Sequence, residues 1–100
     1  MVKHIILWNL KDEYSDAEKW KIKIGIKEGL ESLKGQIPGL IDIHVIIDGL
    51  DSCTADLMLD STFENEGALK GYSIHPDHVA VANSKVRPYT KTRACMDYEV

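Results

Sequence analysis

One stretch decides how this chain is interpreted: Tyr72-Ser73-Ile74-His75-Pro76-Asp77-His78-Val79. Proline is favoured at the first position of a helix, and it pushes the residue before it towards extended geometry. We therefore expect a helix that begins at Pro76, with His78 in its first turn. The helix dipole there favours a neutral imidazole, which beside the phenol of Tyr72 is suited to moving one proton. On these residues alone, the plainer interpretation is favoured, in which His75 and His78 only cap and pack the helix start.

Upstream of this stretch, a long helix is predicted from Ser15 to about Lys34. Ser15 followed by Glu18 is a capping-box pattern, and Gly35 is typical of a helix end. Two patterns compete inside the segment. A strand-like pattern alternates strictly through Trp20, Ile22, Ile24 and Ile26. A helical pattern runs through Ile22, Ile26, Leu30 and Leu33. The length of the segment and its capping favour the helix. Gly25 and Gly29 weaken the helix by about 1 kcal/mol each relative to Ala, and a close approach to the sheet is one reason for glycine there.

Four strands are predicted around these helices, at residues 3–10, 40–47, 54–63 and about 87–98. A short helix through Ala68 and Leu69, ending near Gly71, precedes the proline-initiated one. The order β-α-β-β-α-β is typical of a ferredoxin-like α+β fold, whose helices cover one face of the sheet. The faces predicted to be covered carry His4, Ile6, Trp8 and Leu10 in the first strand, Ile41, Ile43, Val45 and Ile47 in the second, and Leu57, Leu59 and Phe63 in the third.

Several segments, taken in order and spacing, resemble the stress-responsive A/B barrel family, also called Dabb. They are the opening Met1–Asp12, the run Thr62-Phe63-Glu64, Tyr72 with His75-Pro76-Asp77-His78, and the closing Arg93-Ala94-Cys95-Met96-Asp97-Tyr98. The resemblance spans nearly the whole chain and implies one domain over residues 1–100. It also implies a ferredoxin-like protomer that dimerises into an α+β barrel. Most members of the family have no assigned activity.

The same resemblance suggests a site. A plant polyketide cyclase of this family uses a tyrosine and a histidine that match Tyr72 and His78, with a first-strand histidine that matches His4. The predicted strand and helix faces agree, because His4 points towards the helices and His78 shares a helix side that meets the sheet. We expect Tyr72 and His78 to be catalytic and the ligand pocket to include His4, Ile6, Trp8, Ile22, Ile26 and Leu59. Ile22 and Ile26 replace aromatic residues of the family, which leaves the substrate open.

Composition excludes several classes of partner. The formal net charge is −4, and the lysines of the first helix are interleaved with glutamates, so a basic surface for nucleic acid is absent. No apolar stretch approaches the length of a membrane span or a signal peptide. Cys53 and Cys95 fit no metal or redox spacing and are predicted to be reduced thiols, which indicates a cytoplasmic location. We expect no cofactor and no metal.

The uncovered sheet face offers a weaker candidate and a dimer contact. Asp42, His44, Asp56 and Asp60 share this face and could bind a divalent cation, although a polar outer face of an antiparallel sheet explains them without a metal. The apolar residues Ile5, Leu7, Ile46 and Met58 on the same face predict a homodimer. Trp20 and Ile24, away from the helix stripe, are either a further contact or ordinary surface residues.

The predicted function is a small Dabb-like homodimer of unassigned specific activity that binds a small apolar or carbonyl ligand. If it is an enzyme, the resemblance suggests cofactor-free acid/base chemistry of the polyketide cyclase type, with His78 as base and Tyr72 as hydroxyl donor. One alternative is a non-enzymatic, stress-related binding or assembly protein. A second is a cofactor-free monooxygenase of the related dimeric barrel type. Fold alone does not separate the three.

Overall fold

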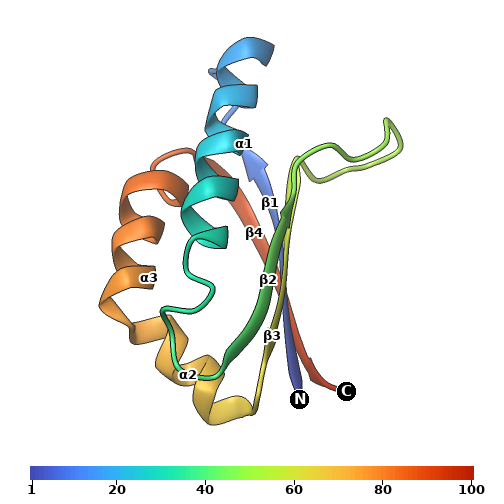
Figure 1. Ribbon diagram of the computed structural model, residues 1–100. Coiled ribbons are helices and arrows are strands. Elements are labelled where there is room, and N and C mark those ends of the chain that lie inside the picture. The colour runs from blue at the N-terminus through green and yellow to red at the C-terminus, as the bar shows by residue number, and fades with distance from the viewer.

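The chain forms one antiparallel sheet with all of its helices on one face, as Figure 1 shows. The computed structural model describes residues 1–100. The elements are β1 (Val2–Leu10), α1 (Asp16–Glu31), β2 (Leu40–Ile46), β3 (Leu57–Phe63), α2 (Glu66–Ile74), α3 (Pro76–Val81), the π-helical turn η1 (Ala82–Val86) and β4 (Thr90–Glu99). The strand order is β2-β3-β1-β4, and the two termini lie together at one end of the sheet (Figure 1). This is the predicted ferredoxin-like α+β arrangement.

The core lies between the sheet and the helices, where the alternation of β1 placed it. His4, Ile6, Trp8 and Leu10 are buried, and the intervening residues of β1 are half-buried or exposed. From α1, the buried Ile26 and Leu30 pack into the same cluster. No helix of the chain is both long and apolar enough to cross a lipid bilayer. Cys53 and Cys95 are both free and exposed.

The predicted face of β2 was wrong at its start. Ile41 is 41% exposed, whereas Leu40 is buried in the core cluster. The pairing of β2 with β3 changes register between Leu40 and Asp42, and such an irregularity moves one residue to the other face of the strand. From Ile43 onwards the predicted alternation is confirmed, because Ile43, Val45 and Ile47 are buried.

Helix α1 begins as predicted and ends earlier. Ser15 accepts a hydrogen bond from the backbone of Glu18, and the side chain of Glu18 accepts one from the backbone of Ser15. The helix ends at Glu31 rather than near Lys34, with Ser32 as its C-cap and the Ser32 hydroxyl donating to the carbonyl of Gly29. A hydroxyl that bonds to nearby backbone competes with further helix, and this residue stops α1 one turn before Gly35.

The glycines of α1 do not face the sheet. A β-carbon at Gly29 would lie 3.0 Å from a methyl carbon of Val81, so the close neighbour of Gly29 is α3. A β-carbon at Gly25 would meet nothing within 4 Å. A close approach to the sheet is therefore not the reason for glycine at either position.

The segment around Pro76 follows the prediction, and its flanks do not. Pro76 opens α3, and the Nδ1 atom of His75 accepts a hydrogen bond from the backbone of Asp77 (3.1 Å). Helix α2 continues past Gly71 to Ile74, so Tyr72 lies inside the helix. Because η1 prolongs α3, β4 starts at Thr90 instead of Arg87. Separately, β3 starts at Leu57 instead of residue 54. The loop between β2 and β3 projects from the body on the side away from the helices (Figure 1).

Candidate functional site

The corner between α2 and α3 brings Tyr72 and His78 together. His75 is in extended geometry and is at once the C-cap of α2 and the N-cap of α3, so the chain turns between the two side chains. The ring centroids of Tyr72 and His78 are 4.1 Å apart, with an angle of 33° between the planes. Proline at the start of α3 makes this corner possible, because it disfavours a helical conformation in the residue before it.

Both side chains end in a polar atom that has no partner. The hydroxyl of Tyr72 and the Nδ1 atom of His78 are buried and make no hydrogen bond within the chain. Buried polar atoms are nearly always hydrogen-bonded, to protein, water or ligand. The hydrogen-bonding capacity of both atoms is therefore open to water or to a ligand.

Burial sets the protonation states of this pair in opposite directions. It raises the pKa of Tyr72, and the positive charge of Arg93 opposes the change only in part. Burial lowers the pKa of His78, and the charges of Arg87, His4 and Arg93 lower it further. The backbone of Ser73 raises the pKa of His78, although this contact falls short of hydrogen-bond geometry. At neutral pH the phenol is protonated and the imidazole is neutral.

The two side chains open into a cavity of about 390 Å³ between the sheet and the helices. Of the predicted pocket residues, the lining includes His4, Ile6, Trp8, Leu59, Tyr72 and His78. Ile22 and Ile26 do not line it, and that expectation is wrong. Ile26 is fully buried in the core cluster, and Ile22 packs against the same cluster.

The pocket residues named from the sequence did not include the rest of the lining, although Ala82 and Val86 were expected on the sheet-facing side of the helix with His78. The further lining residues are Leu30, Leu69, Ser73, Ala82, Val86, Arg87, Thr90 and Arg93. Ala82 and Val86 belong to the π-helical turn η1, a rare conformation that is frequent at functional sites and has no simple sequence signal. Arg93 was noticed only as part of the closing segment.

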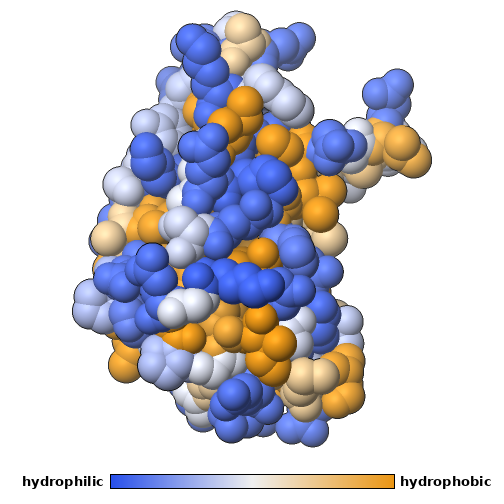
Figure 2. Space-filling model, viewed as in Figure 1, coloured by the Kyte–Doolittle hydropathy of each residue, from blue (hydrophilic) through white to orange (hydrophobic).

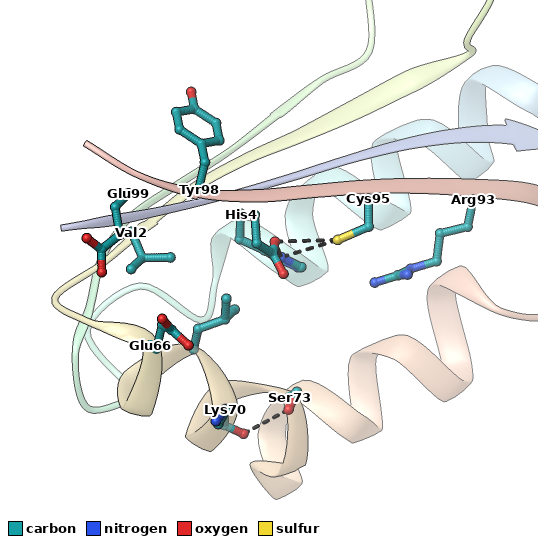
Figure 3. A pocket seen from close by; sticks show the side chains of 11 residues that line it. Val2, His4, Glu66, Lys70, Ser73, Arg93, Cys95, Tyr98 and Glu99 are labelled. Carbon is teal, nitrogen blue, oxygen red and sulfur yellow. Dashed lines mark hydrogen bonds and ion pairs between the residues drawn. The ribbon is translucent and has the colours of Figure 1, made fainter.

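His4 is held by the last strand, as Figure 3 shows. Its Nδ1 atom donates a hydrogen bond to Asp97 Oδ1 (2.5 Å), and the Cys95 thiol donates to the same oxygen (3.4 Å). These atoms line a second hollow, of about 560 Å³, between β4 and α2. The pairing of β1 with β4 places His4 opposite Asp97, which no sequence spacing reveals.

His4, Cys95 and Asp97 are also the candidates for holding a metal ion. Their ligand atoms lie within 4.8 Å of one another. Two observations stand against this use. The His4–Asp97 hydrogen bond already engages two of the three donor groups, and burial together with Asp97 raises the pKa of Cys95, so its thiol stays protonated.

The carboxylates of the opposite sheet face are each bound to a different group. Lys34 forms an ion pair with Asp42 (3.0 Å), and the His44 ring lies 2.9 Å from the same carboxylate. Lys3 forms an ion pair with Asp60 (2.6 Å). Asp56 accepts a hydrogen bond from the backbone of Leu10 (2.7 Å). These contacts favour the interpretation of this face as a polar sheet surface.

Comparison with known proteins places the chain in a family. The family model described as "Stress Responsive A/B Barrel Domain" matches residues 2–100. The chain is a member of this Dabb family. No curated protein sequence matches this Dabb chain. Among solved structures, it is similar to a dimeric protein of unknown function with a ferredoxin-like fold from Bacteroides fragilis, with 34% identity and a TM-score of 0.91 over 99% of this chain and 95% of that one.

Two plant proteins share the fold of this Dabb chain. One, from Arabidopsis thaliana, is 24% identical with a TM-score of 0.75, over 100% of this chain and 95% of that chain. The other is a hydroxynitrile lyase from Passiflora edulis, 16% identical with a TM-score of 0.72, over 97% of this chain and 90% of that chain. At these identities the likeness concerns the fold alone.

Proposed function

We propose that this Dabb protein binds a small carbonyl compound in the cavity and acts on it by cofactor-free acid/base chemistry. One observation carries the proposal. The hydroxyl of Tyr72 and the Nδ1 atom of His78 are buried without partners, in stacked side chains that line one cavity. A carbonyl compound supplies what both lack, because its oxygen accepts a hydrogen bond and its acidic C–H group gives up a proton.

The chemistry follows from the protonation states of the pair. Neutral His78 removes a proton from the carbon next to a carbonyl group, and the electrons of that C–H bond move onto the carbonyl oxygen as an enolate. Tyr72, whose raised pKa keeps its proton in place, donates a hydrogen bond to this oxygen. In an aldol-type closure the enolate carbon then attacks a second carbonyl of the same molecule, and imidazolium returns the proton to the new alkoxide. Loss of this hydroxyl group as water, with enolisation of the remaining carbonyl groups, gives an aromatic ring. A shaped cavity that holds both ends together supplies much of the rate.

We also infer that the protein works as a homodimer joined by the uncovered sheet faces. Leu7 and Ile46 are each 41% exposed there, and Figure 2 shows hydrophobic residues along this side of the sheet and on the projecting β2–β3 loop. The register of β4 adds Met96 and Tyr98 to this face, opposite Ile5 and Lys3. Asp60 is already paired with Lys3, which lowers the cost of burying its charge. The Bacteroides fragilis relative is described as dimeric.

The test of the chemistry is turnover of a linear 1,3,5-tricarbonyl compound, followed by the ultraviolet absorbance of the cyclised aromatic product. We expect Tyr72→Phe and His78→Asn each to lower the enzyme-dependent rate by about 100-fold, since one acid/base or oxyanion group contributes about that much. Tyr14→Phe and His75→Asn are the matched controls. Neither residue lines the cavity, and asparagine preserves the cap that His75 provides.

The alternatives give different results in the same assay. A non-enzymatic binding protein shows saturable binding of the compound without turnover, and its binding is unaffected by His78→Asn. A cofactor-free monooxygenase consumes one molecule of oxygen for each molecule of product, which an oxygen electrode detects. Turnover that continues unchanged in both Tyr72→Phe and His78→Asn contradicts the proposal.

A further inference from the structure

The charge of the cavity is opposite to the charge of the chain. The chain has 16 acidic and 12 basic side chains, and its formal net charge is −4. The cavity of about 390 Å³ nevertheless has no carboxylate in its lining, and it has two guanidinium groups, those of Arg87 and Arg93. The other lining residues are apolar, hydroxyl-bearing or imidazole groups. A protein that is acidic overall therefore presents a cationic wall to whatever enters this cavity.

Neither guanidinium is neutralised within the chain. The ion pairs of the structure involve only lysine and histidine as cations. Arg87 donates to the neutral amide oxygen of Asn83 (2.5 Å), which leaves its charge uncompensated. The nearest acidic side chain along the same face of β4 from Arg93 is Asp97, and that carboxylate is taken by His4. Figure 3 shows Arg93 extending from β4 over the same side of the sheet as His4 and Cys95.

Arg93 also lies at the junction of the two hollows. It lines both the cavity that contains Tyr72 and His78 and the larger hollow between β4 and α2. Arg93 therefore shares the wall of one cavity with Tyr72 and His78 and the wall of the other with Cys95. A group bound to Arg93 is thus within a small molecule's length of the proposed reacting atoms.

We propose that the ligand of this cavity carries a carboxylate, which Arg93 and Arg87 bind while the rest of the molecule lies against Ile6, Trp8 and the Tyr72–His78 pair. This inference rests on the proposed function and names its substrate class as a carbonyl compound with a free carboxylate. The planar fork of a guanidinium group matches the two oxygens of a carboxylate, and such charge-assisted bonds are about twice as strong as neutral ones. Both guanidinium groups are exposed, so water and salt screen part of this attraction.

The alternative is that Arg87 and Arg93 are ordinary solvated surface residues that bind no ligand. A matched pair of probe molecules distinguishes this alternative from a carboxylate site. 4-Phenylbutanoate and 4-phenylbutanamide have the same shape and differ in charge at one end. Binding of each is measured with ¹⁵N- and ¹³C-labelled full-length protein, from the shifts of the Tyr72 and His78 ring signals. We expect the carboxylate to bind about tenfold more tightly than the amide, with a preference that shrinks as the salt concentration rises.

Substitutions locate the preference. Arg93→Gln is expected to remove most of the tenfold difference, Arg87→Gln part of it, and Arg93→Lys to retain some of it because the charge remains. Lys70→Gln is the matched control, since Lys70 lines the neighbouring hollow but not the cavity. All of these positions are exposed, so the variants are expected to fold, and a thermal melt checks this.

The outcomes distinguish the inference from the function on which it rests. If both probes shift the Tyr72 and His78 signals with equal affinity, or if Arg93→Gln keeps the full preference, the carboxylate inference is overturned and the ligand cavity stands. If neither probe shifts these signals while the tricarbonyl compound is turned over, the carboxylate inference alone falls. If there is neither binding nor turnover, the proposed function fails as well.

Discussion

The hydroxyl of Tyr72 and the Nδ1 atom of His78 are both buried and both without a hydrogen-bond partner, although the two rings lie 4.1 Å apart, centroid to centroid. The rings stack at 33° rather than bonding through their polar atoms. The two polar atoms do not bond to each other in this arrangement. In a structural hydrogen-bond network, neighbouring polar groups satisfy one another. Tyr72 and His78 are neighbours and do not, which distinguishes this pair from such a network.

Replacing Tyr72 with phenylalanine tests that distinction through stability. A buried hydroxyl without a partner costs free energy, so we expect Tyr72→Phe to raise the free energy of unfolding by about 1 kcal/mol. Urea denaturation followed by far-ultraviolet circular dichroism measures the change. Tyr14→Phe, at a half-buried position outside the cavity, is expected to change it little. A loss of stability in Tyr72→Phe would mean that the hydroxyl is bonded in solution and has a structural role.

The lowered pKa of His78 predicts a loss of stability in acid. Because the folded state resists protonation, the unfolded chain binds the proton first, at its ordinary pKa of 6.5. The stability that neutral His78 contributes is then fully present above pH 6.5. It is lost as the pH drops from 6.5 through the lower pKa of the folded state. NMR titration of the His78 ring protons gives that pKa directly. His78→Asn should remove this part of the pH dependence, and His75→Asn should keep it. A His78 pKa above 6.5 would contradict the role as general base.

The proposed dimer predicts a specific sensitivity on the uncovered face. Leu7→Asp places a charge in the centre of the apolar face, and burying an unpaired carboxylate costs several kcal/mol. We expect the variant to be monomeric at micromolar concentration, where the unaltered protein is a dimer, as measured by light scattering after gel filtration. Trp20→Asp is the control, because Trp20 is exposed on α1, on the helix side of the sheet. A monomeric unaltered protein, or a Leu7→Asp variant that remains dimeric, would contradict the interface.

The two glycines of α1 make a matched pair for stability. Gly25→Ala adds a methyl group where nothing lies within 4 Å, and alanine favours a helix by about 1 kcal/mol over glycine. We expect this variant to gain about that amount in thermal or urea unfolding. Gly29→Ala gains less, since its methyl group would lie 3.0 Å from a methyl carbon of Val81, and that side chain would have to move by a few tenths of an ångström. Equal gains at both positions would mean that Val81 moves aside freely.

Local chemistry in the sequence was enough for the elements with strong signals. The capping box of Ser15 and Glu18 fixed where α1 begins, and Pro76 fixed where α3 begins. The alternation of β1 identified its buried face without error. Signals of this kind are carried by residues within one helical turn or one strand, so they need no knowledge of the rest of the chain.

The errors occurred where distant residues decide the local conformation. Ile41 was assigned to the core, but the change of register between β2 and β3 sends it to the surface. Ile22 and Ile26 were assigned to the pocket by analogy, but α1 buries Ile26 in the core cluster and packs Ile22 against it. From α1, Leu30 lines the pocket instead, beside residues of α2, α3 and η1. The π-helical turn itself depends on packing that no local pattern reports.

By itself, then, the sequence determined the order of elements, the family resemblance and the presence of Tyr72 and His78 on either side of a helix start. Only the tertiary structure decided what surrounds them. The pairing of β1 with β4 brings Asp97 to His4, and Arg93 comes from the same last strand to the cavity wall. The physical reason is that hydrogen bonds between strands join residues from opposite ends of the chain. A pocket built across such pairs takes its charge from residues whose spacing in the sequence carries no signal.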